Sequence, residues 1–130
     1  MGFVTILDKA ASGEQFLTRQ LEVTSERVTL RELILERIRK EVDEFNREQS
    51  DVFSGLIQPT DAERVLNGYR LKSRRQLNWE HQYAKALEAF EKNGFFVIVD
   101  GRQVEDLDEV IPLRESSEVH FLKLVPLVGG

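Results

Sequence analysis

The sequence has no cysteine among its 130 residues. This absence excludes disulfide bonds, thiolate nucleophiles and cysteine-ligated zinc on the chain itself, so any sulfur chemistry has to come from a partner. No run of apolar residues approaches the length of a membrane span, and the first residues have neither the basic nor the apolar part of a signal peptide. We therefore expect a cytoplasmic protein without a membrane partner.

Motifs of common enzyme chemistry are also missing. There is no glycine-rich phosphate loop and no nucleophile-elbow pattern. The 2 histidines, His81 and His120, lie on different predicted elements without a histidine or cysteine near them, which argues against a metal site. The acidic run Glu105–Glu109 lacks the spacing of a calcium loop, and we interpret it as a solvated turn. We expect this chain to bind no metal or cofactor and to supply no catalytic residue.

Basic charge is scarce and only mildly segregated. The formal net charge is -5, and residues 59–94 are the only basic part of the chain, with a small cluster at Arg70, Lys72, Arg74 and Arg75. An acidic protein with one small basic loop is a poor match for a nucleic-acid surface. A chain of 130 residues is long enough for one compact domain. We expect a monomeric single domain with no nucleic-acid partner.

The first third of the chain predicts a hairpin followed by a helix. Residues 3–7 and 16–23 are two β-rich runs separated by small and polar residues. Thr29 and Glu32 then form a Thr-x-x-Glu capping box, which marks the start of a helix. The helical period of 3.6 residues continues through six apolar positions: Leu30, Leu33, Ile34, Ile38, Val42 and Phe45.

The middle of the chain, residues 47–93, predicts mainly helix. Residues 60–63 form a second Thr-x-x-Glu box, and Asn67-Gly68 stops any helix that begins there after about two turns. Asn78 can cap a longer helix that ends at Asn93-Gly94. The apolar stripe of this second helix is Trp79, Tyr83, Leu87 and Phe90, which we interpret as core packing.

The last third predicts strands. Residues 95–99 and 102–104 flank Asp100-Gly101, a strong hairpin turn. Residues 105–117 are acidic and irregular, and residues 119–125 form a final strand. The order of hairpin, helix, middle segment, hairpin and strand is typical of an α+β fold, in which the last strand commonly lies in the sheet centre beside the first.

This order of elements and the Gly-Gly ending together resemble the ubiquitin-like β-grasp family. Three features carry the resemblance: the Thr29-capped helix, the hairpin around Asp100-Gly101, and the stretch from Arg114 to the end. The family resemblance implies that residues 1–130 form one domain, a mixed sheet of four to five strands crossed by a helix. Residues 47–93, between the first helix and the third strand, are expected to be a helical insert, and residues 126–130 a flexible tail.

The resemblance also implies a chemistry for the tail. In the family an E1-like activating enzyme uses ATP to adenylate the terminal glycine carboxylate, here that of Gly130. Gly129 would help the tail to pass a narrow channel because glycine has no Cβ. Pro126 would stiffen the exit from the sheet, and Leu127 and Val128 would contact an apolar groove of the enzyme. Further partners would be an E2-like transfer enzyme or a sulfurtransferase, and the target proteins.

Three functions remain open at this stage. The ubiquitin-like hairpin and the length of the chain favour a modifier that is conjugated to target amines. The ending Pro126-x-x-Gly129-Gly130 is similar to that of the small sulfur-carrier subunit of molybdopterin synthase, and favours a thiocarboxylate carrier. The third possibility is a β-grasp interaction module whose tail is a frayed terminus that is never activated. We prefer the modifier by a narrow margin.

A partner surface is expected on the sheet. Strand alternation separates Val97, Val99, Val119 and Phe121 from the residues of the other face. By position against ubiquitin, Ile98, His120 and Leu122 match the exposed apolar patch that activating enzymes hold. The candidate interface on this face is therefore Phe96, Ile98, His120, Leu122 and Leu124. An exposed apolar patch of this kind usually marks a partner. The alternative, that the insert or the helix of Trp79 covers this face, is about equally favoured.

Overall fold

The computed structural model of the chain describes residues 2–48, 51–65, 68–73 and 75–124. Within these ranges the protein is an α+β fold with two helices and three sheets. In chain order the elements are β1 (Gly2–Ala10), β2 (Gln15–Val23), β3 (Arg27–Thr29), α1 (Leu30–Glu48), β4 (Val52–Phe53), β5 (Ala62–Val65), β6 (Gly68–Leu71), α2 (Trp79–Glu91), β7 (Phe95–Val99), β8 (Arg102–Val104), β9 (Val110–Pro112) and β10 (Glu118–Lys123).

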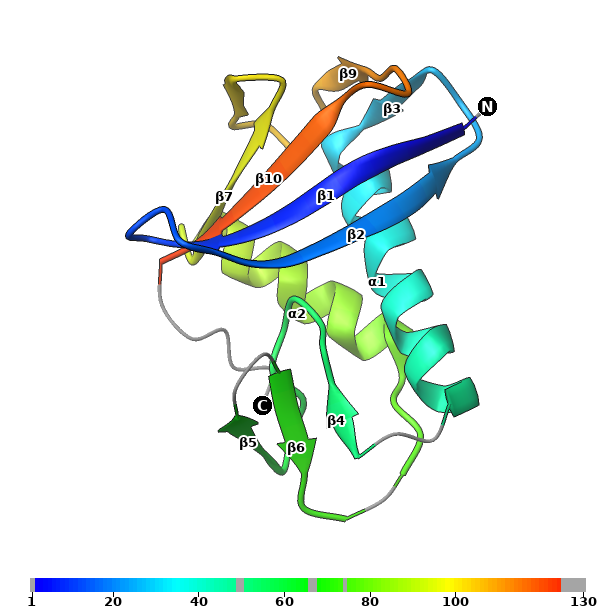
Figure 1. The fold of residues 1–130 in the computed structure, drawn as a ribbon, viewed down its shortest axis with the longest axis vertical. Coiled ribbons are helices and arrows are strands. Elements are labelled where there is room, and N and C mark those ends of the chain that lie inside the picture. The colour runs from blue at the N-terminus through cyan, green and yellow to red at the C-terminus, as the bar shows by residue number, and fades with distance from the viewer. Residues whose placement is uncertain (1, 49–50, 66–67, 74, 125–130) are drawn as a thin grey trace.

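The main sheet is mixed and has five strands in the order β2-β1-β10-β7-β8 (Figure 1). The central pair, β1 and β10, is parallel, with Ile6 opposite Val119, and the other neighbours are antiparallel. The last strand therefore lies beside the first, as the order of elements predicted. The turn between β7 and β8 has the expected conformation, with φ of 49° at Asp100 and 86° at Gly101, both in the left-handed region.

Helix α1 crosses one face of this sheet and begins where the capping box predicted. The Thr29 hydroxyl accepts a hydrogen bond from the Glu32 N–H at 3.1 Å, and a Glu32 carboxylate oxygen accepts one from the Thr29 N–H at 3.0 Å. Its apolar stripe is buried against the inner face of the sheet, in one hydrophobic core with Val4, Ile6 and Val97. The capping box thus fixes where the helix enters, and the stripe fixes which side it buries.

The segment between α1 and β7 differs from the expected helical insert. Besides α2 it contains a small sheet in the order β4-β6-β5, and β5 stands where the second Thr-x-x-Glu box predicted a short helix. Asp61 has a φ of 54°, which is incompatible with a helical first turn at that box. Tyr69 and Leu71 alternate with exposed Arg70 and are buried, so β6 follows a strand period of two. In Figure 1 the small sheet lies below the main sheet, with α2 between them.

Helix α2 has the predicted ends. The Asn78 side chain accepts a hydrogen bond from the His81 N–H at 3.0 Å, and Asn93 adopts the left-handed conformation with a φ of 61°. The apolar stripe that begins at Trp79 packs partly buried against the core, and α2 lies against α1. The interpretation of this stripe as core packing is confirmed.

One pairing lies in a region that the sequence predicted as irregular. Strand β9 pairs with β3, and Ile111 stands opposite Val28. Each strand has three residues, too few to show a clear alternation. Among the described residues, no helix is both long enough and apolar enough to cross a membrane.

Candidate functional site

The predicted tail lies outside the described residues. These positions are Pro126, Leu127, Val128, Gly129 and Gly130. The functions assigned to them therefore stay predictions. The described chain ends at Leu124, directly after β10, so β10 is the element from which the tail continues.

The predicted partner residues gather on one face of the main sheet. His120 stands opposite Ile98, and Leu122 opposite Phe96, so these four side chains form a block on β7 and β10. All four are half-buried, whereas their strand neighbours on the inner face, such as Phe121, are fully buried. Leu124 follows β10 and is exposed. We call these five residues together with Leu7 the outer patch.

Leu7 is the residue of the outer patch that the sequence analysis missed. It stands opposite His120 on β1 and is 9% exposed, so it is the most buried residue of the patch. The signal was available in the sequence, because Ile6 and Leu7 are adjacent in a strand and therefore point to opposite faces. Only the parallel pairing of β1 with β10 shows that Leu7 joins the patch.

Neither helix covers the outer patch. Both helices lie on the other side of the main sheet, as Figure 1 shows. Phe90 of α2 packs against Phe95 of the inner face, with ring centroids 5.7 Å apart. The expectation that the helix of Trp79 covers the outer face is therefore wrong. Polar residues border the patch, among them Glu118, whose carboxylate lies 3.3 Å from the His120 ring nitrogen.

The inner face holds a buried ionic cluster that the sequence analysis did not identify. The Arg37 guanidinium, 0% exposed, donates two hydrogen bonds of 2.6 Å to the Asp8 carboxylate and one of 2.9 Å to Glu41. It also lies 4.4 Å from the centre of the Phe121 ring. The sequence signal is that Asp8 continues the inner-facing positions of β1, while Arg37 and Glu41 lie four residues apart on the stripe of α1.

Glu41 of this cluster and three neighbouring side chains bind the loop between β4 and β5. These four side chains, each from a different helix or strand, each form a hydrogen bond with one backbone group of residues 54–57. Arg19 of β2 donates to the Ser54 carbonyl at 2.5 Å, and Lys123 of β10 donates to the Gly55 carbonyl at 3.3 Å. Glu41 of α1 accepts from the Leu56 N–H at 3.3 Å. Gln82 of α2 donates to the Ile57 carbonyl at 2.9 Å.

The pKa values within the cluster follow from burial and pairing. Burial alone would raise the pKa of Asp8, but the paired Arg37 outweighs it and holds this pKa below its usual value. Burial lowers the pKa of Lys123 to about 8, because its ammonium group loses hydration and lies near Arg37. Burial would also lower the pKa of Arg37, but the two carboxylates keep it raised. Arg37 is therefore a permanent cation inside the protein.

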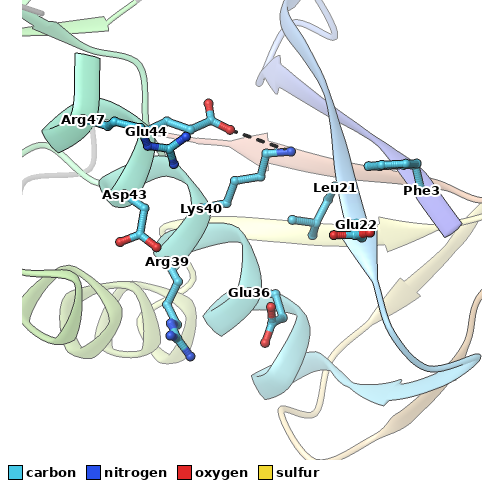
Figure 2. Close-up of a pocket in the computed structure, with 9 residues that line it drawn as sticks. All are labelled: Phe3, Leu21, Glu22, Glu36, Arg39, Lys40, Asp43, Glu44 and Arg47. Carbon is cyan, nitrogen blue, oxygen red and sulfur yellow. Dashed lines mark ion pairs between the residues drawn. The ribbon is translucent and has the colours of Figure 1, made fainter. Parts of the chain in front are cut away.

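A shallow groove lies between α1 and the free edge of β2, with a volume of about 430 Å³ (Figure 2). Its walls carry acidic and basic side chains in similar number, and Lys40 reaches across it. The Lys40 ammonium group donates to the Gln20 carbonyl at 2.8 Å and lies 3.8 Å from the Glu44 carboxylate. Because Lys40 occupies a backbone acceptor of the edge strand, it shields this edge from other strands.

Comparisons with known proteins add no family assignment, because no family model, no curated protein and no solved structure matches this chain. Within the described ranges, no group of three histidine, cysteine, aspartate or glutamate side chains could hold a metal ion. The candidate site is therefore defined by geometry alone: a half-exposed apolar sheet face on the strand that leads to the tail.

Proposed function

We propose that this chain is a ubiquitin-like protein modifier with a β-grasp fold. The fold proposal rests on the main sheet, in which the first and last strands form a parallel central pair and α1 crosses one face. The small sheet and α2 would then be an addition between the first helix and the third strand. No residue of the chain acts as a catalyst in this proposal; its reacting group is the Gly130 carboxylate.

The observation that carries the proposal is that the outer patch and the tail share strand β10. An enzyme that grips His120 and Leu122 on β10 also holds the strand from which the tail leaves. The chain from Lys123 to Gly130 reaches at most about 25 Å when fully extended. A partner bound to the patch could therefore place the terminal carboxylate in its own active site.

The proposed chemistry needs three transfers. The Gly130 carboxylate attacks the α-phosphorus of ATP, and pyrophosphate leaves. A thiolate of the activating enzyme attacks the resulting acyl adenylate, and AMP leaves. An amine of a target protein then attacks the thioester, loses a proton and releases the enzyme thiol, which leaves an isopeptide bond. All sulfur comes from partners because the chain has no cysteine. The proposal requires Gly130 to be the C-terminus of the reacting chain.

A second candidate function is a sulfur carrier, which the Pro126-x-x-Gly129-Gly130 ending favours. The same acyl adenylate would then react with a sulfur donor, and the product would be a thiocarboxylate at Gly130. The two functions share the first step and the outer patch, so they differ only in the nucleophile that attacks.

The test is mass spectrometry of the C-terminal peptide of the protein purified from its source cells. Gly130 in isopeptide linkage to lysines of other proteins establishes the modifier. A thiocarboxylate overturns it in favour of the carrier. A free carboxylate, or a chain that continues beyond Gly130, in every preparation overturns both and leaves an interaction module. The peptide is measured rather than the intact mass, because oxidation of Met1 gives nearly the same nominal shift as replacement of oxygen by sulfur.

A further inference from the structure

A second groove lies on the side of the main sheet where β8 is short. It has a volume of about 790 Å³ and runs between the C-terminal end of α2, the first residues of β7 and the turn after β8. Its floor includes Phe95 and Phe96, and its walls include Glu91 on α2 and Glu105 on the turn. We call it the aromatic groove. The aromatic groove and the outer patch share Phe96 and no other residue.

Strand β7 extends beyond the end of β8 inside the aromatic groove. Strand β8 ends at Val104, which pairs with Val97. Phe95 and Phe96 therefore pair with Lys123 and Leu122 of β10 on one side, and no described strand pairs with them on the other. Because Phe95 has no exposed surface, an occupant of the groove would contact side chains rather than the backbone of β7.

The floor of the groove is apolar and aromatic. The Phe90 and Phe95 rings pack with centroids 5.7 Å apart, and Phe95 packs in turn on Phe121. Phe95 is fully buried, whereas Phe90 and Phe96 are half-buried and offer ring surface to an occupant. Such a floor suits an apolar side chain, and the ring faces also attract cations.

The rim of the groove is acidic. Its charged side chains are Arg31 and four carboxylates. Arg31 pairs with Asp108 at 3.2 Å, so these two charges compensate each other. The remaining carboxylates belong to Glu91, Glu105 and Asp106, and among the described residues neither glutamate forms an ion pair. The groove between α1 and β2 differs, because its charges are mixed and Lys40 shields its strand edge.

From the aromatic floor and the acidic rim we infer that the aromatic groove binds a basic peptide segment of a partner protein, with apolar side chains on the floor and lysine or arginine at the rim. Charge complementarity selects this occupant, because the acidic rim repels nucleic acids, anionic lipids and acidic peptides. The inference goes beyond the proposed function. It does not depend on the tail, because all residues that line the groove lie between Arg31 and Asp108.

The test is a titration of the full chain, labelled with ¹⁵N, with a synthetic peptide in which lysines alternate with phenylalanine and valine. We expect the largest amide shift changes at Phe95, Phe96 and Glu105. A peptide with glutamate in place of lysine, and one with serine in place of the apolar residues, should bind more weakly. Changes centred on the groove between α1 and β2, or spread evenly over the acidic surface, would overturn the inference.

A pair of double variants distinguishes binding in the groove from attraction to the overall negative charge of the protein. Glu91→Gln with Glu105→Gln removes two rim charges without breaking a described contact. It should weaken binding of the lysine peptide by about fivefold, which corresponds to about 1 kcal/mol. The matched control, Glu14→Gln with Glu26→Gln, removes two exposed charges elsewhere. Equal loss in both variants would show nonspecific attraction and contradict a groove site.

Discussion

Each face of β1 and β10 carries side chains that depart from the usual division into an apolar inner and a polar outer face. On the outer face half-buried Leu122 and His120 lie on the same side as buried Leu7, whereas the inner face buries Asp8 next to Arg37. Burial of a charge costs free energy unless it is paired and hydrogen-bonded. The comparison teaches that the inner charges compensate each other by pairing, and that Glu41 of this cluster also binds the loop at Leu56. Neither helix covers the outer patch.

The largest effect is expected when the inner cluster loses its cation. Arg37→Met leaves the Asp8 and Glu41 carboxylates buried without their main partner. The free energy of unfolding should fall by about 3–5 kcal/mol, the usual cost of one missing partner in a buried ion pair. Urea denaturation followed by circular dichroism measures this change.

Arg47→Met is the matched control, because Arg47 lies exposed on the same helix. This variant should stay within about 0.5 kcal/mol of the wild type. If Arg37→Met were as stable as the control, the cluster would contribute packing only, and the contrast between the two faces would lose its energetic basis.

A smaller effect, on the free energy of unfolding, is expected when the pH is raised. The pKa of Lys123, on the inner face, is about 8 in the folded protein and about 10.4 in an unfolded chain. Between these values the unfolded state binds more protons, so the stability should rise as the pH increases from 8 to 10. The gain is of the order of 1 kcal/mol for each unit by which the pKa is lowered.

Thermal or urea unfolding at several pH values measures this gain, and Lys123→Met should abolish it. The groups that face Lys123 are Asp8, Arg37, Glu41 and Arg19. Tyr69 works in the opposite direction at higher pH, because burial raises its pKa. A wild-type stability that is flat or falling between pH 8 and 10 would contradict the assignment.

The sequence predicted the elements that have local start and stop signals, and failed where structure depends on distant pairing. The caps at Thr29 and Asn78 and the turn at Asp100 identified α1, α2 and the β7–β8 hairpin. The prediction of a short helix from the Thr-x-x-Glu box at residues 60–63 was wrong, because the same four-residue pattern can also precede a strand. The pairing of β5 with β6 favours the strand over the helix. The pairing of β3 with β9 joins segments far apart in the chain, which no local pattern encodes.

The residues of the candidate site also divide into those that a local pattern predicts and those that depend on distant pairing. Strand alternation separated the outer patch from the core correctly, because it depends only on the period of two. Leu7 joined the patch only through the register of β1 against β10. The ionic cluster was missed because Asp8 and Arg37 belong to residue types that are almost never fully buried unless paired. Their pairing across β1 and α1 is a tertiary contact, so the sequence could at most show that both occupy inner-facing positions.

The smallest effect on stability is expected on the outer face. Ile98→Glu places a carboxylate in the centre of the outer patch, next to His120. Because Ile98 is already half-exposed, the free energy of unfolding should change by only about 1 kcal/mol or less. Under the proposed function, the same variant should raise the KM for adenylation by the activating enzyme about tenfold, which corresponds to the loss of about 1.4 kcal/mol of binding, while kcat stays unchanged.

The matched control is Gln76→Glu, which adds the same charge at an exposed residue between β6 and α2, outside the patch. It should leave the KM unaltered. Pyrophosphate release at a range of protein concentrations measures both constants. If Ile98→Glu left the KM unchanged, the outer patch would not be the surface that the enzyme grips. If it lowered kcat instead, the patch would act in positioning the tail rather than in binding, because an interaction lost only in the transition state lowers kcat and kcat/KM together.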